Sequence, residues 1–268
     1  MSTNELVKVI LVDACFIVEL FCQKYHKEWT DLMKTRLLFD ISLELLLLEN
    51  QVPFFILEKL YNLAYACHDD SNSHSFLELS INFFEYFKKQ ELVPNFTTCH
   101  FTDLLRTFHL QNPSPNRKSV TGVEPIPTAT AFGEAGGKFK TNESKCILDW
   151  QFSRVCFTIP NIELDNTTQI LFRNMVALKQ CHYPDCGYMT DYVWAMDFII
   201  NTVEYVDILN KNGILIRLLG DDDAVAKMFN SLATNVLKED FNSQHLGLFK
   251  EMNAFYNDGW HQMRATLK

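Results

Sequence analysis

Apolar residues recur at steps of three and four along most of the chain, which is the spacing of a helix with one buried face. In residues 5–23, apolar side chains also cover much of the remaining circumference, so we expect this first helix to be enclosed on more than one side. The spacing predicts helices over residues 5–23, 32–49, 54–64, 73–90, 101–110, 165–180, 188–209, 221–236 and 241–266.

Three polar residues interrupt the most apolar segment, residues 40–61, at Glu49, Asn50 and Gln51. Pro53 disfavours helical geometry at the residue before it, and its own φ suits the first turn of a new helix. The polar residues are therefore predicted to lie at a corner between two helices. Amide side chains can donate to and accept from the backbone groups left unpaired there, which favours a structural role over ligand binding.

The pattern changes from helical spacing to alternation in one stretch. Residues 147–152 alternate, and a second apolar run follows a two-residue link formed by Ser153 and Arg154. A third strand is expected near residues 138–140. The sequence therefore predicts a mainly α (α+β) fold, in which a helical globular protein carries a small antiparallel β-sheet insertion at about 138–160.

Proline marks a boundary near the middle of the chain. Four of the eight prolines fall between Pro113 and Pro127, in a stretch without apolar periodicity. Such a stretch is typical of an exposed, mobile loop. We expect an N-terminal helical part (1–110), a Pro-rich mobile loop (111–127), and a small sheet with a C-terminal helical part (128–268), joined in one compact domain.

Composition and charge exclude several classes of protein. The chain has 268 residues, a net charge of −9 and no basic run, whereas nucleic-acid binding needs a concentrated Lys/Arg surface. The first apolar stretch contains Asp13 and Glu19 and lacks the features of a secretory signal. No run approaches the ~20 uncharged apolar residues of a membrane helix. As given, the chain is expected to be soluble and cytoplasmic, without a membrane span.

Eight cysteines are spread along the chain without the spacing of a disulfide framework, so we expect reduced thiols. Glycosylation sequons occur at Asn95, Asn142 and Asn166, but they carry little weight without an export signal.

Two clusters of polar residues are candidates for metal sites. The segment CHYPDC holds Cys181, His182 and Cys186, but a structural zinc site needs four converging ligands, and no second Cys or His pair lies in a similar loop. The aspartates that begin at Asp221 are better explained as a helix cap than as a magnesium site. Catalytic motifs such as a Gly-x-Ser-x-Gly elbow or a P-loop are missing from the sequence. We assign no catalytic, cofactor-binding or metal-binding residue.

Seven segments, in this order, resemble the plant domain-of-unknown-function family 247: ELVKVILVDACFIVELF, ELLLLENQVPFFILEKLY, HFTDLLRTF, ATAFGEAGGKFK, ILDWQF, FTIPNIELDNTTQILFRNMVALKQC and LLGDDDAVAKMFNSL. The resemblance covers almost the whole chain, and LLLLENQVPFF is its most specific part. Full-length members also resemble one another in an upstream region with an SIGPYHHG-like segment, and usually end in an apolar membrane helix. Neither is present in these 268 residues, and Gly136–Gly137 stands where Gly-Val is more usual.

The resemblance implies a plant protein that is associated with the plasma membrane when complete. Members are linked to self-incompatibility in grasses and to reproductive or growth control, and the family supplies no catalytic site to carry over. We therefore expect a non-enzymatic protein–protein recognition or signalling module that uses no cofactor and binds an unknown protein partner. The mobile loop 111–127 is the expected variable contact surface. The alternative is a small-molecule receptor or enzyme with a cleft between the helical parts.

The cysteine cluster gives a first testable prediction. Purified protein should contain no stoichiometric zinc, and changing both Cys181 and Cys186 to Ser should leave its helical content unchanged, because two thiols and one imidazole do not complete a structural site. Elemental analysis and far-UV circular dichroism measure both. Stoichiometric zinc that disappears from the double variant together with its fold would contradict this reading.

Overall fold

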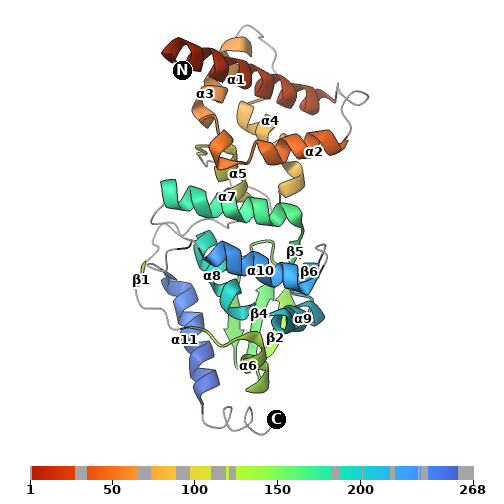
Figure 1. The fold of residues 1–268 in the computed structure, drawn as a ribbon, viewed down its shortest axis with the longest axis vertical. Helices are drawn as coiled ribbons and strands as arrows, with labels where there is room; N and C mark the ends of the chain where they lie inside the picture. Colours follow the sequence, from red (N-terminus) through yellow and green to blue (C-terminus); the bar gives the residue numbers. More distant parts are fainter. Residues whose placement is uncertain are drawn as a thin grey trace. The chain divides into compact units, whose positions relative to one another are not determined.

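The computed structural model describes residues 2–27, 35–65, 74–88, 97–109, 119–120, 125–182, 188–200, 202–217, 221–234, 236 and 241–258. The protein is mainly α-helical with a small sheet, as predicted (Figure 1). It divides into two compact units, Met1–Phe108 and His109–Lys268, and each is described by itself.

Much of the expected loop lies outside the described residues. Within 111–127, Ser119–Val120 form the short strand β1, and residues 125–127 are described. The mobility of this loop, and the joining of the parts into one compact domain, stay predictions.

The first unit is helical. Its elements are α1 (Thr3–His26), α2 (Thr35–Glu44), the 3₁₀ helix η1 (Leu48–Asn50), α3 (Phe54–Tyr65), α4 (Phe76–Phe83), the 3₁₀ helix η2 (Glu85–Phe87) and α5 (Phe101–His109). Helix α1 packs against both α3 and α4, and α3 also packs against α4. All three therefore share one core.

Phenylalanine rings build that core. The ring of Phe21, at 0% exposure, stacks on Phe83 with centroids 4.1 Å apart. It also meets the rings of Phe76, Phe84 and Phe101 at 5.7, 5.9 and 5.3 Å. Buried aromatic rings remove large apolar areas from water, so this cluster joins α1, α4 and α5.

The polar corner is built as the sequence predicts. The Gln51 amide donates to the carbonyls of Leu45 and Leu47 at 2.6 and 2.9 Å, while its oxygen accepts from the backbone N–H of Phe101 at 3.1 Å. The Asn50 amide donates to the carbonyl of Glu44 at 3.1 Å. Side chains thus satisfy backbone groups at the end of α2 and at the start of α5.

The corner also corrects one boundary. A single helix was expected over 32–49, but α2 ends at Glu44 and only η1 follows it. The carbonyls that a continuing helix would use accept side-chain amides instead, so the corner replaces about one and a half turns of the expected helix. Helix α3 begins directly after Pro53, as predicted.

The second unit contains helices and short strands. Its elements are β1, α6 (Ala129–Glu134), β2 (Lys138–Asn142), β3 (Gln151–Ser153), β4 (Cys156–Pro160), β5 (Ile162–Leu164), α7 (Asn166–His182), α8 (Tyr188–Ile199), α9 (Val203–Lys211), β6 (Leu215–Arg217), α10 (Asp222–Ala233), β7 (Phe241–Asn242) and α11 (Ser243–Asn257). Helix α8 packs against α7 and α10, and α6 packs against β2 and α9 (Figure 1).

The insertion predicted at 138–160 is present, but its sheet is mixed. Its strand order is β2–β4–β3, with β3 antiparallel to β4 and β2 parallel to β4. The expectation of a wholly antiparallel sheet is therefore corrected for β2. The hairpin turn is Arg154–Val155, one residue later than expected, and Arg154 has φ 59°. The pairs β5–β6 and β1–β7 were not predicted.

Two helix predictions have opposite outcomes. The segment 188–209 forms two helices rather than one, because Thr202 is extended (φ −140°, ψ 168°) before α9. The cap at Asp221 is confirmed: its side chain accepts from the N–H of Ala224 at 2.8 Å. Gly213, which follows α9, has φ 71°, a conformation typical of the residue after a helix.

Gly137 has a packing reason to be glycine. A Cβ atom at this position would lie 2.4 Å from the ring of Phe132, which is fully buried. A valine at position 137, which is more usual in the family that this chain resembles, would therefore require the Phe132 ring to move.

The corner gives a stability prediction. Gln51→Ala should lower the free energy of unfolding of the first unit by about 2 kcal/mol, because it leaves the N–H of Phe101 and two carbonyls without side-chain partners. Asn50→Ala, which removes one exposed hydrogen bond, should cost less than about 1 kcal/mol. Native-state hydrogen exchange of peptides from α3 and α5 measures the loss. Equal effects of the two substitutions would contradict the role of Gln51.

Candidate functional site

The first half of α1 is an exposed apolar surface, which we call the α1 surface: Leu6, Val7, Val9, Leu11, Val12 and Phe16. Val12 is 67% exposed and Phe16 is 49% exposed. The expectation that this helix is enclosed on more than one side is wrong for these turns. Its buried residues begin at Ala14, because the core cluster around Phe21 lies against the second half of the helix.

Helix geometry divides the α1 surface into two parts. At 100° per residue, Val9, Val12 and Phe16 lie within about 60° of one another, on the side roughly opposite Phe21. They form a stripe that faces away from the core of the unit. Leu6, Val7 and Leu11 extend the apolar area around the first three turns.

Carboxylates border the stripe. Glu5 precedes it, Glu19 follows it and Asp13 lies beside it, whereas Lys8 is the one basic residue among these turns. Glu5 completes a capping box with Ser2, and hydrogen bonds from the Ser2 backbone and side chain hold the pKa of this carboxyl below its usual value. The border of the α1 surface is therefore acidic.

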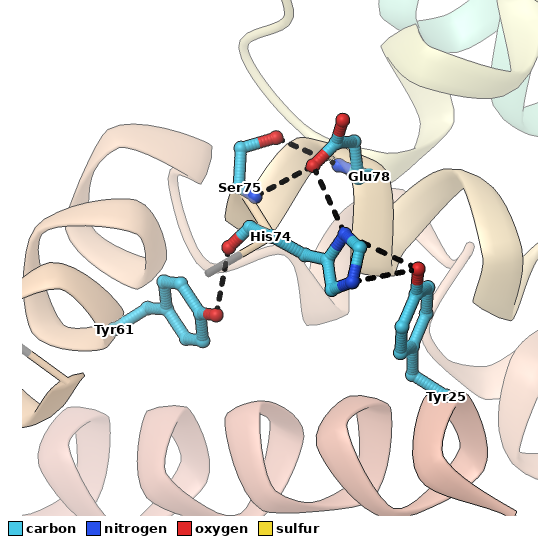
Figure 2. Close-up of polar contacts among 5 residues, drawn as sticks. All are labelled: Tyr25, Tyr61, His74, Ser75 and Glu78. Carbon is cyan, nitrogen blue, oxygen red and sulfur yellow. Dashed lines mark hydrogen bonds and ion pairs between the residues drawn. The ribbon is translucent and has the colours of Figure 1, made fainter. Parts of the chain in front are cut away.

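A second candidate is a pocket of about 350 Å³ within the same unit, lined by Tyr25, His74, Glu78, Ile81, Asn82, Glu85 and Lys88. The Tyr25 hydroxyl lies 3.1 Å from Nε2 and 3.2 Å from Nδ1 of His74 (Figure 2). The same imidazole lies 3.7 Å, through Nδ1, from a carboxylate oxygen of Glu78. The tautomer that suits both neighbours has Nδ1–H facing Glu78 and Nε2 accepting from Tyr25.

The backbone of His74 is held from a third helix. Tyr61 on α3 donates its hydroxyl to the carbonyl of His74 at 2.8 Å (Figure 2). Burial, together with the nearby Cys22 and Glu78, raises the pKa of this tyrosine, so it stays a donor well above neutral pH. His74 therefore links α1, α3 and the start of α4.

Ser75 and Glu78 beside His74 suggest a serine triad by residue type alone. However, the Ser75 hydroxyl accepts from the N–H of Glu78 at 3.2 Å, and Glu78 returns a bond to the N–H of Ser75 at 2.7 Å. This is a capping box at the start of α4. Within the described residues, Ser75 makes no hydrogen bond to the imidazole, so the contact that would activate a serine is not formed.

The clusters singled out in the sequence belong to the second unit, whereas both candidates belong to the first. Cys181 and His182 are exposed at the end of α7, in the second unit, and Cys186 lies outside the described residues. Among the described residues, no group of three His, Cys, Asp or Glu side chains could hold a metal ion. The pairing of Tyr25 with His74 was missed because 49 positions separate them in sequence. The one local signal was the Ser-x-x-Glu capping box beside His74.

Comparison with known proteins gives a family. The model of the family DUF247, plant protein of unknown function, matches residues 1–268. The chain belongs to this family. No solved structure matches this DUF247 chain. In the part of the chain that the structure describes, no helix is long and apolar enough to cross a membrane.

Two Arabidopsis thaliana proteins resemble the DUF247 chain. UPF0481 protein At3g47200 is 26% identical over 98% of the chain and 62% of its own length. Putative UPF0481 protein At3g02645 is 26% identical over 71% of the chain and 35% of its own length. The chain therefore spans less than two thirds of either relative.

The link through His74 can be tested by stability. Tyr61→Phe should lower the free energy of unfolding of the first unit by about 1 kcal/mol, because it removes one hydrogen bond to the His74 carbonyl. Tyr86→Phe is a matched control, since Tyr86 is 68% exposed. Hydrogen exchange of peptides from α3 and α4 measures both. No difference between the variants would show that the Tyr61 hydroxyl does not hold the start of α4.

Proposed function

We propose that this DUF247 chain is a non-enzymatic protein–protein recognition or signalling module, and that the α1 surface is its contact site. The observation that carries the proposal is the run of exposed Leu, Val and Phe side chains over the first half of α1. A contiguous exposed apolar patch is typical of an interaction site, whereas single exposed apolar residues are ordinary.

The free energy gained by covering these side chains is large enough for a specific contact. Each side chain of the stripe, Val9, Val12 and Phe16, is about half exposed or more, so covering it contributes on the order of 1 kcal/mol. A partner's own apolar face contributes a similar amount. Together these exceed the lower estimates of the cost of association, about 4 kcal/mol, so a small contact can be stable.

Family and charge support the same class of function. The link of DUF247 members to self-incompatibility and reproductive control implies recognition between proteins, and we propose such a role here. The net charge of −9 disfavours nucleic acid as the partner.

The second candidate is a small-molecule receptor or enzyme. One observation favours it: the polar pocket in which Tyr25, His74 and Glu78 converge. The sequence placed this alternative in a cleft between the two helical parts, whereas the pocket lies within the first unit. It is ranked second because the Ser75 hydroxyl is engaged in a helix cap.

The proposal predicts the outcome of affinity capture from plant reproductive tissue with four baits. The intact chain should retain a specific protein. Val12→Asp should lose it, because a charge in the stripe opposes burial. Val203→Asp, at a position that is exposed on α9, should retain it, and so should a bait with residues 111–127 replaced by a Gly/Ser linker.

Each contrary result has a definite meaning. Loss of the partner only from the loop-replaced bait would assign recognition to that loop. A tightly retained small molecule without any protein partner would favour the receptor or enzyme. Circular dichroism of each bait confirms that the substitutions leave the helices intact.

A further inference from the structure

The chemistry of the α1 surface indicates the kind of partner that fits it. We propose that the α1 surface binds an amphipathic helix of another protein, whose apolar stripe is bordered by Lys and Arg. This inference rests on the proposed recognition role and adds the partner's shape and charge to it.

The shape follows from α1 being a helix. Its backbone groups are already hydrogen-bonded along the helix, so the α1 surface offers no free edge to which a strand could add. Its side chains at positions 9, 12 and 16 have the i, i+3, i+7 spacing that fits the grooves of a second helix. Such a partner would cover the stripe over about 10 Å of helix length.

The charge of the partner follows from the border. Glu5, Asp13 and Glu19 surround the stripe and outnumber Lys8. Within the described residues, Asp13 makes no hydrogen bond or ion pair, so its carboxylate is available to a partner. Basic side chains at the edge of an incoming helix would meet these carboxylates, which raises the rate of association and selects against acidic partners.

The same border disfavours two other occupants. A second copy of this chain would present the same acidic border, and like charges facing one another cost free energy. An anionic lipid surface would be repelled as well, since binding to it uses clusters of Lys and Arg. The border therefore favours a basic helix over both.

Two synthetic peptides of about 18 residues, long enough to form a helix, test this inference. They share one apolar stripe, and differ in having either Lys and Arg or Glu along its borders. Fluorescence anisotropy with the whole 268-residue chain should show at least about tenfold tighter binding of the basic peptide at low salt. The difference should shrink in about 0.5 M NaCl, where exposed charges are screened.

Three variants assign the result to the surface. Val12→Asp should remove binding of the basic peptide. Asp13→Lys should reduce the preference between peptides several-fold. Glu204→Lys makes the same reversal of charge at an exposed position on α9, in the second unit, and should leave the preference unchanged.

The outcomes separate this inference from the proposed function. If both peptides bind equally well and Val12→Asp removes the binding of both, the partner's basic border is overturned. The α1 surface then stays a recognition surface. If the peptides bind and Val12→Asp does not change their affinity, both the helical partner and the α1 surface as the contact site are overturned. If neither peptide binds, two further results would overturn the helical partner. Self-association in sedimentation that depends on Val12 would favour a second copy of this chain. Binding to phosphatidylserine vesicles that depends on Val12 would favour a membrane.

Discussion

The amide of Gln51 joins two segments that are fifty residues apart in sequence, and the first unit depends on this junction. It accepts from the first N–H of α5 and donates to two carbonyls beyond α2. The hydroxyl of Thr102 adds a bond to the carbonyl of Leu46 at 2.7 Å. Because Phe101 begins α5, the junction also fixes one ring of the core around Phe21. A polar corner and an aromatic core are therefore parts of one arrangement.

The position of this core explains why α1 has two different halves. Rings from α4 and α5 gather around Phe21, so the second half of the helix is buried while the first half has exposed apolar side chains. An exposed helical end frays unless its N–H groups are satisfied. The capping box between Ser2 and Glu5 satisfies two of them, and so supports helical geometry in turns that the core does not reach. The proposed contact surface is thus held in shape by local bonds.

The link through His74 has a structural consequence whatever its chemistry. One imidazole contacts Tyr25 near the end of α1 and Glu78 in the first turn of α4, while the backbone of the same residue accepts from Tyr61 on α3. These bonds lie at the other end of α1 from the α1 surface.

Local sequence signals determined a large part of this protein. Apolar spacing predicted a mainly α-helical fold, and Pro53 and Asp221 marked helix starts because capping and ring geometry act within a few residues. The polar triplet ending at Gln51 was interpreted as a corner for the same reason. The sequence could not show that Phe101 is the partner of Gln51, that β2 runs parallel to β4, or that Tyr25 meets His74. Only the tertiary structure decided these features, and with them which half of α1 is exposed, because each depends on contacts between residues far apart in the chain.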